Sequence, residues 1–479
     1  MSNFDFFKAG FILSISISIM SCKDDSNYQS AYEELLRSNE IQRKAHLTND
    51  ATLLANEIAD SMVYIQNGMI RIASNTEIKT RFEAYFKQMK YTSWDDVQPP
   101  MIKISKDGSM ATVAVQKLID TQQMDSLTNL GEHEYTLFAW SAQFKLINGT
   151  WKMTANTSTS KTLTQEEAFK LPIHLSEEYA VINELDLIPE GFAFDNTTQT
   201  AYVSSTYKQK IVALHPDGTY ADFKSEKEDG LWSTVGMEVD EINQKLWVIS
   251  SNAHEALPMK YPDPKTEWSS KIFEYDLATG QLVKTYEPKI EGRFFFNDLC
   301  VSRSGKVFIT ESVQNKVYEL TPTTGAFEAL AIQDSLFTFP NGITLADDDR
   351  YLYVTNRNGI IQYDLRDKGF TYLDKSSGIE PIRIDGLAYY KGTLIANQPF
   401  RNRILQYDLD ETKGKITAQR ILEANNQHFD QPTTGELAGD AFIYLANAQM
   451  SSGFGNRIIK PLDSLEAVRI LKVMIPIKP

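Results

Sequence analysis

The stretches FNDLCVSRSGKVFITE at residues 296–311 and PNGITLADDDRYLYVTN at residues 340–356 decide the fold of this chain. Each begins with a polar turn, continues as a short apolar strand, turns again and ends in a second apolar strand. Short strands separated by polar or glycine-containing turns are typical of antiparallel β-structure. Because the same order returns further along the chain, we interpret the two stretches as neighbouring copies of one repeat.

The repeat occurs six times in the C-terminal two-thirds of the chain. Its copies start at PEGFAFD (189–195), VGMEVD (235–240), FNDLCVS (296–302), PNGITLA (340–346), IDGLAYY (384–390) and TGELAGD (434–440). A spacing of roughly 45 to 60 residues is the size of one four-stranded propeller blade, and a closed ring leaves no long strand edge exposed. The sequence therefore predicts a mainly β protein with a six-bladed β-propeller over residues 185–479.

Four of the copies carry an oxygen-bearing side chain in the same register of the repeat. These side chains are Glu190, Asn297, Asn341 and Asp385, and Asp298 directly follows Asn297. Each of them taken alone is an ordinary turn residue. Turn chemistry does not explain their common register, however. The entrances of the innermost strands of a propeller meet at one end of its central channel, so we expect the four side chains to converge there.

Two carboxylates and two amide carbonyls are ligands that suit a hard cation. We expect one divalent ion at this end of the channel; calcium fits best, and magnesium, manganese and zinc are the alternatives. The few histidines and cysteines show no CxxC, no HExxH and no His pair at helical spacing, which argues against a site of nitrogen and sulfur ligands. An ion with an open position polarises a carbonyl while a nearby carboxylate accepts a proton.

The motifs PEGFAFD, FNDLCVSRSGKVFITE, PNGITLADDDRYLYVTN and IDGLAYYKGTLIANQ resemble those of the gluconolactonase, senescence marker protein and LRE-like region family. The resemblance implies a six-bladed propeller with one catalytic divalent ion that hydrolyses lactones or related esters. It implies that Glu190, Asn341 and Asp385 are metal ligands and that Asn297 is a ligand or a substrate contact. It also implies that Asp385 is the general base and that Asp298 orients the site.

The chain departs from the family pattern where the substrate is recognised. Members that act on sugar lactones have an arginine two residues before the Asn-Asp pair, whereas this chain has Phe295 there and Arg293 is displaced. We expect the cluster of Phe294, Phe295 and Phe296 to pack in the core, with an apolar wall for a more hydrophobic lactone as the alternative. The second blade offers Glu238 where related paraoxonases have a histidine, which disfavours a histidine-based esterase mechanism.

Residues 22–160 follow a different pattern, with helices first and strands later, as in an α+β domain. Ser74-Asn75-Thr76-Glu77 is a capping box that opens a helix, and Asn148-Gly149 joins two alternating segments as a hairpin. We expect earlier helices around 32–45 and 51–59. The closing sequence FKLINGTWKMTANTST resembles the cone-shaped nuclear transport factor 2-like, SnoaL-like superfamily. Residues 161–184 are interpreted as a linker to the propeller.

Members of that superfamily often contain a pocket in the cone. Tyr64, His133, Glu134 and Trp140 are candidates to line it, and the alternative for His133 is a solvated entry into a strand. The cone is then either a binding or dimerisation unit or, as a further alternative, the enzyme of the chain.

Composition excludes some classes of partner and compartment. The 479 residues include 63 acidic and 48 basic side chains, for a net charge of −15, and no run of basic residues could neutralise a nucleic acid backbone. The apolar run 9–20 is the size of a secretory signal, and Ile19-Met20-Ser21-Cys22 resembles a bacterial lipobox. This implies a signal peptide over 1–21 and a lipid anchor on Cys22, which leaves Cys300 without a disulfide partner.

The acidic residues after Cys22 resemble an export signal of surface lipoproteins, so we expect an outer-membrane or cell-surface location in a Gram-negative bacterium. The leading functional hypothesis is a metal-dependent hydrolase of lactones or related esters. The alternative is a non-catalytic propeller, stabilised by a metal, that binds a glycan or a protein partner. The missing arginine is the feature that favours the alternative.

Overall fold

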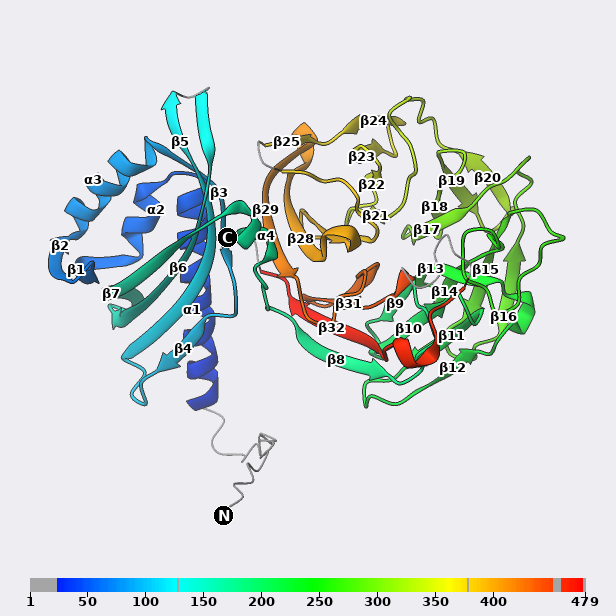
Figure 1. Ribbon diagram of the computed structural model, residues 1–479, viewed down its shortest axis with the longest axis horizontal. Coiled ribbons are helices and arrows are strands. Elements are labelled where there is room, and N and C mark those ends of the chain that lie inside the picture. The colour runs from blue at the N-terminus through cyan, green and yellow to red at the C-terminus, as the bar shows by residue number, and fades with distance from the viewer. Residues whose placement is uncertain (1–23, 127–128, 377–378, 451–457, 477–479) are drawn as a thin grey trace, which may run out of the picture.

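The computed structural model describes residues 24–126, 129–376, 379–450 and 458–476 (Figure 1). The predicted signal segment and Cys22 lie outside the described residues, so the lipid anchor stays a prediction. Among the described residues, no helix is both long and apolar enough to cross a membrane.

The N-terminal part is a seven-stranded sheet with helices over one face (Figure 1). Its helices are α1 (Asp24–Leu47), α2 (Ala51–Asn56) and α3 (Asn75–Phe86). Its strands are β1 (Ile58–Gln66), β2 (Met69–Ser74), β3 (Met89–Asp96), β4 (Met101–Ile104), β5 (Met110–Ser126), β6 (Asn129–Ile147) and β7 (Thr150–Leu163). The order is β2-β1-β7-β6-β5-β3, and β4 pairs with β5. The predicted capping box of Ser74 and Glu77 is confirmed at the start of α3.

Two predictions for this part are wrong. The helix expected over 51–59 ends at Asn56, and Ile58 already begins β1, because its β-branched side chain pairs with β7. The pocket candidates Trp140 and His133 also do not lie on one face of the sheet. Trp140 packs under the helices with Trp94, whereas His133 lies on the opposite face of the sheet beside Asp120. Alternation along β6 separates the two side chains.

The rest of the chain forms six antiparallel sheets arranged in a ring (Figure 1). The first blade consists of β9 (Phe192–Asp195), β10 (Thr200–Ser205), β11 (Lys210–Leu214) and β12 (Tyr220–Lys224). The second consists of β13 (Ser233–Asp240), β14 (Lys245–Ser251), β15 (Ser270–Asp276) and β16 (Leu282–Tyr286). The third consists of β17 (Phe296–Val301), β18 (Val307–Glu311), β19 (Lys316–Thr321) and β20 (Ala326–Ala329). The fourth and fifth are β21 (Ile343–Leu345), β22 (Tyr351–Asn356), β23 (Gly359–Asp364) and β24 (Gly369–Tyr372); and β26 (Leu387–Tyr390), β27 (Thr393–Gln398), β28 (Arg403–Asp410) and β29 (Lys415–Ala424), with β25 (Asp374–Lys375) on its edge. The six-bladed propeller and the mainly β class are thus confirmed.

The sixth blade closes the ring with a strand from far upstream. It consists of β30 (Gly435–Ala438), β31 (Ala441–Leu445), β32 (Val468–Met474) and β8 (Glu177–Ile182). β8 comes from the segment interpreted as a linker, which also contains helix α4 (Gln165–Lys170). Short 3-10 turns lie in the loops at η1 (Glu228–Gly230), η2 (Pro399–Arg401), η3 (Glu411–Lys413) and η5 (Leu462–Ser464).

Each blade begins at its innermost strand and is covered on both faces by its neighbours. The second strand of the fifth blade, TLIANQ in β27, is buried at all of its positions. A strand covered on both faces reads as a continuous apolar run, which is why these strands were recognisable in the sequence. Cys300 in β17 is buried in the core, as expected.

The N-terminal part contacts the fifth blade through buried polar groups. Arg420 of β29 forms an ion pair with Glu40 of α1, and the N–H of Ile421 donates to Asp95 Oδ2 over 3.1 Å. Arg43 Nε donates to Asp95 Oδ1 over 3.1 Å, and an Arg43 terminal nitrogen donates to the carbonyl of Gln419 over 2.7 Å. Every charge in this contact has a partner, as buried ions require.

His46 makes the N-terminal part sensitive to acid. Its ring stacks on Trp94 at 3.6 Å, and its Nδ1 donates to the carbonyl of Gln42 over 2.7 Å. Burial lowers the pKa of His46 to about 4, against an ordinary value of about 6.5. The unfolded chain therefore binds a proton between these two pH values while the folded protein does not.

We expect this difference to reduce the free energy of unfolding by about 3 kcal/mol as the pH falls from 6.5 to 4, and to have no effect above pH 6.5. Urea unfolding at pH 7 and at pH 4.5 measures it. His46→Phe keeps a ring against Trp94 and should flatten the pH dependence. An equal loss of stability in both proteins would assign the acid sensitivity to other groups.

Candidate functional site

The entrances of the six innermost strands touch one another around the central channel. A Cβ atom added to any of four glycines at these entrances would come too close to a carbonyl oxygen of the next blade. The distance would be 1.8 Å between Gly191 and Val235 and 2.7 Å between Gly236 and Asn297. It would be 2.3 Å between Gly342 and Asp385 and 2.8 Å between Gly386 and Thr433. The hydroxyl of Thr433 donates to the carbonyl of Glu190 over 3.0 Å and closes the circle. The glycines are therefore required by close approach of neighbouring backbones.

Gly191→Ala is expected to destabilise the propeller by about 3 kcal/mol or more, because the carbonyl of Val235 cannot move without displacing the next blade. The matched control is Gly369→Ala on β24, where no atom lies within 4 Å of the added Cβ. It should change the free energy of unfolding by less than about 1 kcal/mol. Equal effects in denaturant titrations would contradict the close contact.

Glu190 points into this ring without a compensating partner. Its side chain is 5% exposed, and its Oε2 atom is buried with no hydrogen-bond partner. Burial raises its pKa well above the ordinary value, and the nearby carboxylates of Asp385 and Asp298 raise it further. A buried carboxylate in this state is stabilised by a cation.

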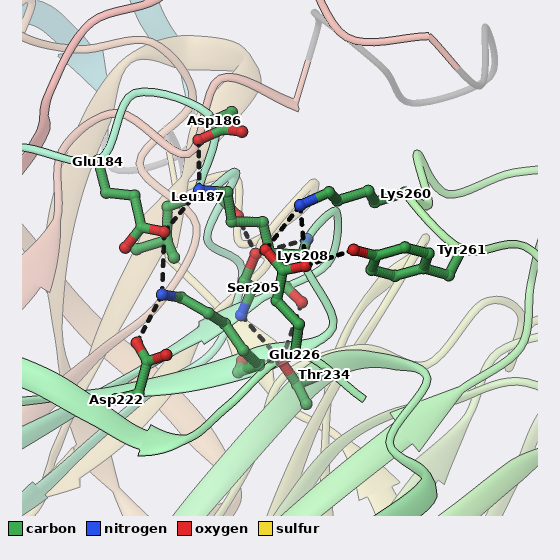
Figure 2. A network of polar contacts seen from close by, with 11 residues as sticks. Glu184, Asp186, Leu187, Ser205, Lys208, Asp222, Glu226, Thr234, Lys260 and Tyr261 are labelled. Carbon is green, nitrogen blue, oxygen red and sulfur yellow. Dashed lines mark hydrogen bonds and ion pairs between the residues drawn. The ribbon is translucent and has the colours of Figure 1, made fainter. Parts of the chain in front are cut away.

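A polar network fixes the segment that carries Glu190 (Figure 2). Lys208 binds Glu184 over 2.6 Å and Asp186 over 2.7 Å, and Lys210 binds Glu184 over 2.9 Å. Ser205 donates its hydroxyl to the carbonyl of Leu187. These contacts hold the chain immediately before Glu190, so the position of its carboxylate is set by the first blade.

Asn341 and Asp385 meet directly across two blades. Asn341 Nδ2 donates to Asp385 Oδ1 over 2.5 Å. Burial raises the pKa of Asp385 to about 6, and this hydrogen bond limits the rise. Asn297 is buried, and its Nδ2 donates to Ser312 Oγ over 3.1 Å, so its amide oxygen is the atom left to accept or to coordinate.

Three further carboxyl groups lie deeper in the channel. Asp298 accepts from the N–H of Leu299 over 2.9 Å, and burial raises its pKa to about 7. Burial and Glu436 raise the pKa of Glu238, and burial and Asp298 raise that of Glu436 to about 8. Glu238 thus lies near Glu436 and Asp298, and Asp298 links the third and fourth blades by accepting from the N–H of Ile343 over 3.4 Å.

The aromatic cluster divides between two environments. Phe294 and Phe296 are buried in the core. Phe295 is half-buried and packs also against the long loop between β14 and β15, with Trp232 and Trp268. This loop leaves β14 at the end beside the start of β13, so it lies on the same face of the ring as Glu190. The core prediction holds for two of the three rings, and Phe295 contributes to an apolar border on the channel face.

Two residues at the site were not found from the sequence. Asn397 of β27 is fully buried, and neither its side-chain nitrogen nor its oxygen has a hydrogen-bond partner among the described residues. Its Oδ1 lies 3.4 Å from the Cβ position of Gly386, beside Asp385. The other is Glu436. Asn397 is the last residue but one of β27, and Glu436 follows a glycine, so neither residue shares the register of the four candidates.

The donor set fits a hard cation. No three His, Cys, Asp or Glu side chains are close enough to hold a metal within the ranges that the structure describes. A site built from the predicted residues would combine the carboxylates of Glu190 and Asp385 with the amide oxygens of Asn297 and Asn341. Oxygen ligands of this kind suit calcium, with water in the other positions.

No family model and no curated protein matches the chain. A gluconolactonase from Xanthomonas campestris aligns over 65% of this chain and 93% of its own, with 16% identity and a TM-score of 0.43. A streptogramin B lyase aligns over 62% of this chain and 97% of its own, with 16% identity and a TM-score of 0.42. A luciferin-regenerating enzyme aligns over 61% of this chain and 94% of its own, with 14% identity and a TM-score of 0.42.

Proposed function

We propose that the propeller is a metal-dependent hydrolase of lactones or related esters. The observation that carries the proposal is the buried carboxylate oxygen of Glu190, which has no hydrogen-bond partner and lies near the carboxylate of Asp385. Raised pKa values at Glu190 and Asp385 support a site that is completed by positive charge.

In this proposal, Asp385 is the general base and Phe295 borders the substrate site. Asn341 fixes Oδ1 of Asp385, which leaves Oδ2 to take the proton from an attacking water molecule. A divalent ion held by the four residues would draw electron density from the ester carbonyl. Phe295 and its aromatic neighbours border the channel face where a sugar-binding arginine would be expected, so the proposed substrate is a lactone with an apolar substituent rather than a sugar lactone.

The test is hydrolysis by the purified protein under pH-stat control. Ring opening releases one proton per lactone, so a solution of an alkyl-substituted γ- or δ-lactone should acidify when calcium is present and stop when a chelator is added. Gluconolactone should be a poorer substrate. Bound ion without turnover on the whole lactone panel would favour the alternative, a binding propeller, for which the absence of the arginine is the supporting observation.

A further inference from the structure

A second cavity lies between the N-terminal sheet and the fifth blade, away from the channel. Its volume is about 620 Å³, which is within the range of small-molecule sites, and domain interfaces are preferred places for such sites. Figure 1 shows α4 and β29 between the two parts of the chain. The cavity is lined on the N-terminal side by β3, β5, β6 and α4, and on the propeller side by β28, β29 and the turn at η2.

The wall on the N-terminal side combines apolar side chains with the pair of Asp120 and His133 and with Thr92, Ser93 and Asp95. Leu118 and Tyr135 are buried here on the face of the sheet that the helices do not cover. His133 Nδ1 lies 2.8 Å from Asp120 Oδ1, and its ring stacks on Tyr135. The pairing of Nδ1 leaves Nε2 as the atom that can contact a ligand.

The wall on the propeller side carries the two cations Arg401 and Arg403 and the carboxylate of Glu380. Arg401 is paired with Glu380 at 2.6 Å. Arg403 Nε donates to Gln398 Oε1 over 2.7 Å, and its two terminal nitrogens have no hydrogen-bond or ion-pair partner among the residues that the structure describes. Burial and the neighbouring Arg401 lower the pKa of Arg403 below its ordinary value, and the charge of Glu380 acts in the opposite direction. The guanidinium is thus half-buried, with its terminal nitrogens open to a ligand.

The other charged side chains at the cavity already have hydrogen-bond or ion-pair partners. Asp120 faces His133, Glu380 holds Arg401, and the two oxygens of Asp95 accept from Arg43 and from the N–H of Ile421. Arg401 and Arg403 therefore share the single carboxylate of Glu380 on the propeller side of the cavity. A planar guanidinium with two free nitrogens is suited to bind a carboxylate through two parallel hydrogen bonds.

We propose that this interdomain cavity is a binding site for a small organic carboxylate with an apolar or aromatic body. Arg403 binds the carboxylate, the apolar wall of Leu118 and Tyr135 covers the body, and His133 Nε2 contacts a polar group at the far end. Such a ligand would contact both parts of the chain and stabilise their association. The site is separate from the channel, so the inference does not depend on the proposed hydrolase.

Calorimetric titration with phenylacetate, 4-phenylbutyrate and cinnamate tests the proposal, with phenylacetamide as the neutral match for phenylacetate. We expect saturable binding of at least one acid and binding of the amide at least about tenfold weaker, since a buried charge-assisted hydrogen bond is lost. Arg403→Met should weaken binding of the acid by at least about tenfold. Arg366→Met, on an exposed turn of the fourth blade, should leave it unchanged.

A second variant tests the cavity without removing the cation. Gln419→Trp on β29 adds a ring to the lining and should reduce binding while Arg403 stays in place. The proposal is overturned if the acid and the amide bind equally, if Arg403→Met retains full affinity, if Gln419→Trp has no effect, or if none of the three acids binds at concentrations up to about 10 mM. Melting curves of each variant establish that it is folded.

Discussion

Asp385→Asn is expected to reduce lactone hydrolysis by about 10³-fold or more while the propeller stays folded. An asparagine cannot accept the proton of the attacking water, and general base catalysis contributes about 10² to 10⁴ in rate. The fold should survive because the new amide oxygen can still accept the hydrogen bond from Asn341 Nδ2. Turnover numbers by pH-stat, together with a melting curve, measure both effects.

The stability of the same variant in a chelator gives a second readout. Asp385 raises the pKa of Glu190, so removal of its charge should increase the melting temperature when no divalent ion is present. The matched control is Asp367→Asn, the same chemical change on an exposed turn in the fourth blade, which should alter neither activity nor stability. Hydrolysis at the parent rate by Asp385→Asn would remove this residue from the mechanism.

Glu190→Gln is expected to abolish stabilisation by calcium. In the parent protein, a free calcium concentration 100 times the dissociation constant should increase the free energy of unfolding by about 2.7 kcal/mol. The variant keeps the size of the side chain but lacks the unpartnered carboxylate oxygen, so the ion should bind at least about tenfold more weakly. Calorimetric titration of chelator-treated protein measures the affinity.

Glu328→Gln on β20 is the control for this experiment, because Glu328 is exposed and distant from the channel entrance. It should bind calcium as the parent does. If Glu190→Gln also binds and is stabilised like the parent, the ion is held elsewhere and the four candidate residues are not its ligands.

Features that depend on neighbouring residues could be predicted from the sequence. The turn at Asn341, the buried strand TLIANQ and the capping box at Ser74 are each encoded within a few residues. The repetition of these motifs also placed Glu190 and Asp385 in a common register. Residues in this register contact the neighbouring blade, as Gly342 contacts Asp385 and Thr433 contacts Glu190. Because the blades form a ring, residues at the same position of each repeat lie close together around the central channel.

Features that depend on distant partners could not be predicted. β8 is completed by β32, and its Glu178 pairs with Arg469 almost 300 residues later in the chain, so nothing local distinguishes it from a linker. The same applies to Arg420, whose partner Glu40 belongs to the first helix. Asn397 was missed because a buried asparagine at the end of a strand carries no signal until its neighbours are known.

The most direct measurement is an anomalous difference map from crystals grown with manganese, which takes oxygen ligands and scatters anomalously. The account predicts one strong peak at the channel entrance, within coordination distance of Glu190, Asn297, Asn341 and Asp385, that calcium displaces. A map without a peak there, or with its ion bound at other residues, would contradict the metal site on which the proposed function rests.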